Sequence, residues 1–475
     1  MIAARLADRS IGLVGTVILA RLLTPADFGL VAMATAVIGL IELASAFGFE
    51  VSLVRKANPT REHYDTVWTL NVLFGVGCGA LTAALALPTA AFYGDERLIP
   101  IMVVLGAAWA VGGLSNVGVV DFQRTLNFTR EFQFLITRRL VGSVVTISLA
   151  IWTRSYWALI VGQVVLRVTG LILSYLWHSF RPRLSLKATR EIFSFSFWIF
   201  VDKLASFGSM RASDFVLGRT HGPAEVGLYR LGEEIGHLPG TELVAPMNRA
   251  LLPGVSQMIE GGRPTRELVV AATGVVGLLL VPACLGISAI ADPLVRVLLG
   301  SQWLAAVPLV QIMAINSMFL AFWANQHTTL FAAGMPHVCG VISVVRLVIF
   351  SVCLFLLVRD AGAQGVALSA LISSVATLLL GLWASLPALG VRLGEYLFVL
   401  WRPFVSASIM WTSVNWLSTH LPDSDAVGFA VARLGALIVA GCVVYLSSMF
   451  VLYVVAGRPM GTERLLLARL ALWFR

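Results

Sequence analysis

The sequence places charged side chains inside long apolar segments, and it concentrates them between residues 202 and 249. A charged group at the centre of a membrane-spanning helix costs at least ~2.5 kcal/mol on insertion scales, so such groups should face protein or water. A hydrated cavity explains this concentration, and pairing between neighbours on one helix is the alternative. The residues concerned are Asp202, Lys203, Arg211, Asp214, Arg230, Glu233, Glu234, His237, Glu242 and Arg249.

Some of these charges are spaced for pairing within a helix. Arg211 and Asp214 are three positions apart. Arg230 precedes Glu233 and Glu234 by three and four positions. Residues at these separations are neighbours on a helix surface, so local pairs could account for part of the charge.

The second half of this stretch also carries a histidine and a run of glycines. His237 follows Glu233 by four positions, so the two share a helix face that could carry protons. Gly232, Gly236 and Gly240 recur every four residues, which predicts close approach of a neighbouring helix along that stripe.

Arg346 lies in a different apolar segment and has no acid within one helical turn. It is therefore a candidate for an anionic ligand, because a guanidinium group donates two parallel hydrogen bonds to a phosphate and stays charged. The sequence has no nucleophile elbow, P-loop or metal-ligand cluster. We therefore expect no catalytic residue, no metal and no cofactor.

The elements that carry these residues must be transmembrane helices. Only 12% of the 475 residues are charged and the mean hydropathy is +0.87, whereas soluble domains carry roughly 25% charged residues. The net charge of +9 comes from basic residues in short loops, which argues against a nucleic acid partner. We predict an all-α polytopic membrane protein with about fourteen transmembrane helices. They lie near residues 2–23, 29–49, 67–89, 99–120, 137–152, 156–177, 193–218, 225–250, 267–291, 307–330, 338–358, 366–386, 404–420 and 428–455.

The loops between these segments differ in charge. With the N-terminus in the cytoplasm, the cytoplasmic loops and the adjoining ends of the spans carry 21 Lys and Arg residues, and the corresponding outer regions carry 6. Cytoplasmic loops of membrane proteins are enriched in Lys and Arg, so this bias sets the orientation. Both termini are predicted to be cytoplasmic.

One sequence motif occurs twice. Residues 19–30 read LARLLTPADFGL and residues 217–228 read LGRTHGPAEVGL, and they align without a gap. The two copies lie six predicted spans apart, so both face the same side of the membrane. This is a parallel repeat about an axis along the membrane normal, as in transporters whose substrate site lies between two halves. Locally, Thr24 with Asp27 is typical of a helix N-cap and its capping box.

The repeat and the spans together predict four regions. Residues 1–180 form an N-terminal six-helix bundle and residues 190–387 form a C-terminal six-helix bundle. Residues 400–456 form two additional transmembrane helices, and residues 457–475 form a basic amphipathic cytoplasmic tail.

The sequence resembles the polysaccharide-exporter and oligosaccharide-flippase branch of the multidrug/oligosaccharidyl-lipid/polysaccharide superfamily, particularly colanic-acid-type exporters. The resemblance is carried by LARLLTPADFGLVAMA at 19–34, GLYRLGEEIGHLP at 227–239 and LLGSQWLAAVPLVQIM at 298–313. It implies two six-helix bundles around a cationic cavity. It also implies undecaprenyl-diphosphate-linked oligosaccharides as substrates, and alternating access coupled to an ion gradient in the bacterial inner membrane.

This resemblance suggests roles for the intramembrane charges. The substrate-binding candidates are Arg211, Arg230 and Arg346, and the ion-coupling candidates are Asp214, Glu233 and Glu234. The expected partners are a lipid-linked oligosaccharide, membrane lipids, and the polysaccharide polymerase and glycosyltransferase machinery, with no nucleic acid.

Two other functions fit less well. A cation-coupled multidrug antiporter of the same superfamily would call for a mainly acidic or aromatic cavity, whereas arginines here match the acids in number. A membrane-embedded glycosyl polymerase or ligase would present acids or histidines in a sizeable outer loop, and the predicted outer loops are all short.

Overall fold

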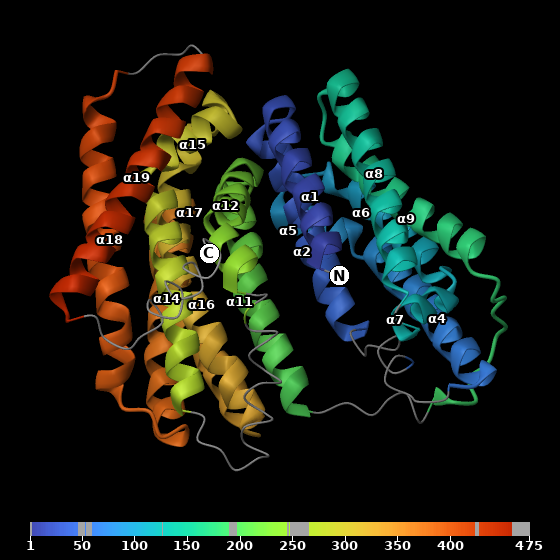
Figure 1. Ribbon diagram of the computed structural model, residues 1–475. Helices are drawn as coiled ribbons and strands as arrows, with labels where there is room; N and C mark the ends of the chain where they lie inside the picture. The colour runs from blue at the N-terminus through green and yellow to red at the C-terminus, as the bar shows by residue number, and fades with distance from the viewer. Residues whose placement is uncertain are drawn as a thin grey trace. The chain divides into compact units, whose positions relative to one another are not determined.

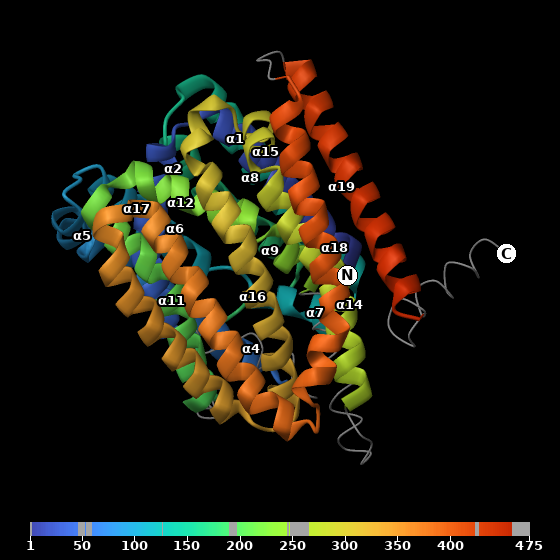
Figure 2. The same ribbon diagram turned by 90° about the vertical axis from the view of Figure 1, so that its left-hand side faces the viewer.

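The computed structural model is helical, with no strand in the part of the chain that it describes. The described residues are 2–45, 53, 59–125, 127–189, 197–244, 247, 266–422 and 427–457. The chain divides into two compact units, whose helices are shown from two sides in Figure 1 and Figure 2. Unit 1 comprises Met1–Phe197 and Ser213–Gly227, and unit 2 comprises Trp198–Ala212 and Leu228–Arg475.

Unit 1 is built from antiparallel helices that approach one another at glycines. A β-carbon at Gly75 would lie 2.8 Å from the Cα atom of Gly113, so the helices that carry them touch backbone to backbone. The elements are α1 Ile2–Leu22, α2 Pro25–Ser45, α4 Arg61–Ala84, α5 Ala86–Tyr93, α6 Leu98–Gly113, η1 Val117–Val120, α7 Asp121–Arg124, α8 Phe128–Thr153 and α9 Trp157–Trp177.

A sharp bend follows α6 and shapes one end of unit 1. The chain turns by 70° from α6 into η1 and α7. Asn116 holds the bend, because its side chain accepts a hydrogen bond from the backbone N of Gly118 at 2.9 Å. Its own backbone N donates to Ser174 Oγ of α9, also at 2.9 Å. The bend therefore fixes α7 against the end of α9.

Unit 2 contains the longer helices. Gly362 has φ 49° and ψ −130° and breaks α17 into two arms, each longer than the roughly 20 residues that a spanning helix needs. The helices α18 and α19 run side by side (Figure 2). The elements are α11 Phe197–His221, α12 Pro223–Gly236, the π-helical turn η2 Gly240–Val244, α14 Arg266–Ala289, α15 Ala291–Leu298, η3 Ser301–Ala306, α16 Val307–Ala332, α17 Pro336–Ala388, α18 Leu393–His420 and α19 Val427–Val455. The far end of α11 and the first turns of α12 belong to unit 1.

The helices confirm an all-α polytopic membrane protein. Among the described residues, nine helices are long and apolar enough to cross a membrane, or ten if the bent pair counts as one span. Each of the fourteen predicted spans overlaps a described helix, but a count of fourteen crossings stays a prediction. Large apolar side chains are exposed, among them Trp152 at 85% and Trp383 at 81%. Such surfaces suit lipid rather than water.

Loop contacts agree with the predicted alternation of sides within each unit. In unit 1, the backbone N of Tyr156 donates to Asp27 Oδ1 at 3.2 Å. Asp27 belongs to a predicted outer loop, and Tyr156 is the first residue of the predicted span 156–177, at its outer end. In unit 2, Arg266 Nε donates to Glu395 Oε2 at 2.8 Å, and both belong to predicted cytoplasmic loops. Which end of each unit faces the cytoplasm stays a prediction.

The first copy of the repeated motif forms the predicted capped turn. Between α1 and α2, Thr24 donates to Asp27 Oδ2 from its backbone N at 2.9 Å and from its hydroxyl at 2.7 Å. The backbone N of Asp27 donates back to Thr24 Oγ1 at 3.4 Å. This reciprocal pair satisfies donors that a helix start otherwise leaves without partners.

The two copies of the motif contact each other within unit 1. A β-carbon at Gly29 would lie 1.7 Å from the carbonyl O of Pro223, and one at Gly227 would lie 1.8 Å from that of Pro25. The contact is reciprocal, since each glycine meets the proline of the other copy. This agrees with a relation between the copies, while the superposition of the full six-helix blocks stays a prediction.

Candidate functional site

A charged network lies on α12 in unit 2. Arg230 Nη1 donates to Glu233 Oε2 in a short ion pair, and the two side chains are only 19% and 15% exposed. This is the pairing predicted from their spacing. Because both groups are largely shielded from solvent, their mutual neutralisation lowers the cost of holding charge in this part of the helix.

Close packing against α16 extends this network to a second helix. A β-carbon at Gly232 would lie 2.8 Å from Leu309 Cβ, and one at Gly236 would lie 2.6 Å from Met313 Cβ. The predicted close approach along the glycine stripe is therefore confirmed. It brings the buried Asn316 to His237, with 3.1 Å between Asn316 Nδ2 and His237 Nε2.

Asn316 fixes how this histidine can be protonated. If Asn316 Nδ2 donates, then His237 Nε2 must accept, which places the ring proton of the neutral form on Nδ1. Asn316 is 2% exposed, and its Oδ1 atom has no hydrogen-bond partner among the described residues. Glu233, Arg346 and Arg230 all lie within electrostatic range of His237.

The structure brings some predicted site residues together and separates others. In unit 2, His237 lies within electrostatic range of Arg230, Glu233 and Arg346. Arg211, half-buried on α11, lies one turn beyond the contact of that helix with α17, where a Gly208 β-carbon would be 3.1 Å from Leu347 Cδ1.

The remaining predicted residues lie elsewhere. Asp214 is fully buried in the segment of α11 that belongs to unit 1, within electrostatic range of Tyr93. Glu234 is exposed on α12. Arg249 lies outside the described residues, as do the side chains of Asp202 and Lys203.

Unit 1 contains a cationic pocket that the sequence did not reveal. Its volume is about 600 Å³, and Arg138 of α8 and Arg167 of α9 line it. The Arg167 guanidinium carbon lies 3.7 Å above the ring of Trp109 on α6. A cation over an indole ring is attracted by the negative face of the ring, so Trp109 holds Arg167 without occupying its hydrogen-bond donors.

Small residues and one acid complete this pocket. A β-carbon at Gly112 would lie 3.2 Å from Arg167 Nη1, and one at Gly170 would lie 3.0 Å from Arg138 Cδ. Glu131, which also lines the pocket, accepts a hydrogen bond from Gln123 Nε2 at 2.9 Å. The glycines are the signal that could have pointed to this pocket, since they make room for arginine side chains.

These arrangements are suited to binding an anion and moving a proton. Arginine donors, a carboxylate and a histidine are present, and the described residues contain no group of three or more His, Cys, Asp or Glu side chains that could hold a metal ion. The function therefore depends on which anionic molecule a membrane protein of this kind transfers.

The chain is similar to proteins of cell-surface polysaccharide synthesis. It is 23% identical over 399 residues to the lipopolysaccharide biosynthesis protein WzxC of Escherichia coli strain K12, covering 83% of this chain and 81% of the relative. It is 24% identical over 430 residues to the succinoglycan biosynthesis transport protein ExoT of Rhizobium meliloti strain 1021, covering 90% of this chain and 87% of the relative.

Solved structures share the fold. The inward closed conformation of the lipid II flippase MurJ matches with a TM-score of 0.73 at 12% identity, over 95% of this chain and 99% of that one. An inward-facing multidrug resistance transporter of the MATE family matches with a TM-score of 0.60 at 16% identity, over 80% of this chain and 94% of that one. At these identities the match concerns the fold alone.

The family model described as polysaccharide biosynthesis protein matches residues 18–308, which is more than half of the sequence. This match confirms the predicted resemblance, and the chain belongs to the polysaccharide biosynthesis protein family.

Proposed function

We propose that this protein moves lipid-linked oligosaccharide precursors, carried on undecaprenyl diphosphate, across the bacterial inner membrane for surface polysaccharide synthesis. Family membership supports this, as do relatives named for lipopolysaccharide biosynthesis and succinoglycan transport. The observation that carries the proposal is the set of arginines within membrane helices, at Arg230 and Arg346 in unit 2 and at Arg167 in unit 1. A diphosphate headgroup needs such donors, while its lipid tail remains in the bilayer.

Substrate binding is assigned to Arg211, Arg230 and Arg346 of unit 2. Arg138 and Arg167 line a separate cationic pocket within unit 1. Each guanidinium can donate two parallel hydrogen bonds to phosphate oxygens. No bond of the substrate is broken, so the protein acts as a transporter and needs no catalytic group.

Ion coupling is assigned to Asp214, Glu233 and Glu234. Coupling requires that Glu233 and the substrate phosphate compete for the same group. The ion pair between Arg230 and Glu233 meets this requirement, because the Arg230 guanidinium can bind either one. Protonation of Glu233 releases Arg230 to hold phosphate, and loss of that proton favours the internal pair and release of the headgroup. One charge that crosses 100 mV supplies ~2.3 kcal/mol, which biases such an equilibrium about fiftyfold.

The proposal includes an orientation and a setting. Both termini face the cytoplasm. The protein works beside glycosyltransferases, which supply its substrate, and a polysaccharide polymerase, which uses the transported units. Cysteines placed at Arg154 and Asp360 should react with an impermeant thiol reagent in intact cells. Labelling only after cell lysis would contradict this orientation.

Complementation tests the function. The protein, expressed in a strain that lacks its flippase for an undecaprenyl-linked repeat unit, should restore surface polysaccharide and clear the accumulated lipid-linked intermediate. The alternative, a cation-coupled multidrug antiporter, shares the fold. Raised resistance to cationic drugs, with the lipid-linked intermediate still accumulating, would favour that alternative and refute the flippase.

A further inference from the structure

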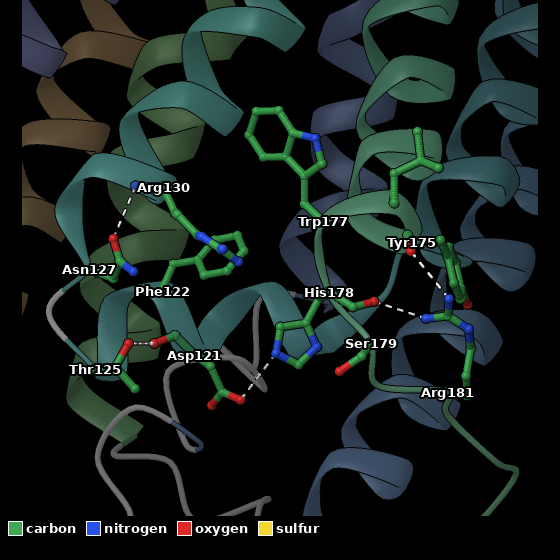
Figure 3. A pocket seen from close by; sticks show the side chains of 11 residues that line it. Asp121, Phe122, Thr125, Asn127, Arg130, Tyr175, Trp177, His178, Ser179 and Arg181 are labelled. Carbon is green, nitrogen blue, oxygen red and sulfur yellow. Dashed lines mark hydrogen bonds and ion pairs between the residues drawn. The ribbon is translucent and has the colours of Figure 1, made fainter.

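A second pocket in unit 1, of about 610 Å³, lies where α9 ends and α8 begins (Figure 3). It is distinct from the pocket around Arg138 and Arg167, although Phe122 borders both. The polar side chains that matter here are Asp121, Asn127, Arg130, His178 and Arg181, all drawn in Figure 3. No role in moving the oligosaccharide is assigned to any of them.

The single acid of this pocket is already surrounded by donors. Tyr64 donates a short hydrogen bond to Asp121 Oδ1, and Arg124 Nη1 lies 3.5 Å from the same oxygen. His178 Nε2 lies 3.5 Å from Asp121 Oδ2. Asp121 therefore links α4, α7 and the end of α9 through these contacts. Its negative charge is compensated by the neighbouring donors, so Asp121 is not expected to bind a ligand.

The two arginines of the pocket are used differently. Arg181 Nη1 donates to the carbonyl oxygens of His178 at 2.8 Å and Phe180 at 3.0 Å, so this side chain caps the end of α9. The exposed Arg130 uses only its backbone N, which donates to Asn127 Oδ1 at 3.2 Å. Within the described part of the chain, no acid or carbonyl accepts a hydrogen bond from the Arg130 guanidinium. It lies in the first turn of α8, where the helix dipole adds positive potential.

One wall of the pocket is apolar and exposed. Leu176 lines it and is 71% exposed on α9. Trp177 and Tyr175 stand beside it at the helix end, where aromatic residues mark the boundary between hydrocarbon and headgroups. A pocket with cationic donors on one side and an exposed leucine on the other fits an amphiphile at that boundary.

The segment after α9 supports a position at the membrane surface. Leu184 and Leu186 are 76% and 53% exposed, and they alternate with the exposed Arg183 and Lys187. The backbone N of Ser185 donates to Thr69 Oγ1 at 2.9 Å, so the segment is fixed against α4. Leucines alternating with basic residues are suited to contact an anionic bilayer surface.

We infer that this pocket binds an anionic glycerophospholipid, with the headgroup phosphate between Arg130 and Arg181 and the acyl chains along Leu176. Among the described residues, no acid pairs with the Arg130 guanidinium. The phosphate of such a lipid supplies the negative charge that this guanidinium can bind. The site is independent of the proposed transport of oligosaccharide.

Native mass spectrometry of the delipidated full-length protein tests the site. Palmitoyl-oleoyl phosphatidylglycerol and palmitoyl-oleoyl phosphatidylcholine are added separately at matched concentrations. Both lipids have the phosphate, but the choline ammonium of phosphatidylcholine offsets its charge and is repelled by the two arginines. The wild-type protein should therefore retain the phosphatidylglycerol about tenfold more tightly. Arg130→Ala should abolish this preference and leave phosphatidylcholine binding unchanged. Fold is checked by the thermal unfolding midpoint, which should not move because the Arg130 guanidinium holds no described structural contact.

Two controls decide the interpretation. Arg183→Ala removes an exposed arginine of the same region that does not line the pocket, and its preference should equal that of the wild type. Inorganic phosphate at millimolar concentration should not displace the lipid. Displacement by phosphate would assign the pocket to a free anion, and an unchanged lipid preference in Arg130→Ala would overturn the site altogether.

Discussion

The arginines of the two units are stabilised by different partners. In unit 2, Arg230 is paired with Glu233, and His237 lies within electrostatic range of this pair and of Arg346. In unit 1, Arg167 rests on the face of Trp109 and lines a pocket of about 600 Å³. A carboxylate competes with a ligand for the arginine hydrogen bonds, whereas an aromatic face leaves those donors available.

This difference separates two tasks. A carboxylate partner can be switched off by a proton, so the unit 2 network can change its affinity for an anion with the ion gradient. The ring of Trp109 has no charge to lose, so its contact with Arg167 should not change with the ion gradient. The comparison therefore predicts that substitutions in the unit 2 network can alter coupling, whereas substitution of Trp109 in unit 1 alters binding alone.

The largest effect is expected from removing the unit 2 arginines. Arg230→Ala or Arg346→Ala should abolish polysaccharide export in a complementation assay, with protein abundance near normal. Lysine at either position should rescue only partly, because it cannot donate two parallel hydrogen bonds. Arg359→Ala, on the same helix as Arg346 but exposed at a predicted outer loop, is the matched control. Full complementation by both alanine variants would remove the unit 2 network from the binding site.

The next effect concerns coupling at Glu233. Glu233→Gln removes the charge that competes for Arg230, so headgroup binding should be retained while transport in proteoliposomes loses its dependence on an imposed pH gradient. Glu234→Gln changes the adjacent but exposed acid and should have a smaller effect. If Glu233→Gln transported with an unaltered dependence on the gradient, the contrast between the two units would fail.

The smallest effect is expected from substituting Trp109, whose ring contacts the Arg167 guanidinium. Trp109→Leu removes a cation–π contact of about 0.5–2 kcal/mol, so the apparent affinity for substrate should fall a few fold to about thirtyfold. The dependence on the ion gradient should be unchanged. Trp152→Leu replaces an 85% exposed tryptophan and serves as the control. A change in gradient dependence with Trp109→Leu would show that unit 1 also takes part in coupling.

Some parts of the site could be predicted from the sequence because they depend on one helix. The pairing of Arg230 with Glu233 follows from their spacing on α12, and the structure contains it. The stripe through Gly236 predicts close approach of another helix, and α16 supplies it. The ion pair and the close approach could both be predicted without knowing which helix packs against α12.

Other parts depend on partners that are distant in sequence. Asp214 is fully buried and lies within electrostatic range of Tyr93, a residue far away in the sequence that gave no signal as its neighbour. Asn316 gave no signal as a partner of His237, because the two residues are 79 positions apart. Arg138 lies near the start of a predicted span and was not recognised as part of a pocket.

The sequence by itself determined that this protein is a multi-pass helical membrane protein of its family, and which segments form its helices. The physical reason is that hydrocarbon imposes a local rule, since each crossing segment must be apolar and must satisfy its own backbone hydrogen bonds as a helix. The tertiary structure decided which charged and aromatic side chains meet. Contacts between side chains of different helices depend on how each helix is rotated and on how closely its neighbours approach. Glycines such as Gly232 and Gly236 permit a close approach. Both the rotation and the approach are determined by packing among helices, and the order of residues along one helix does not determine them.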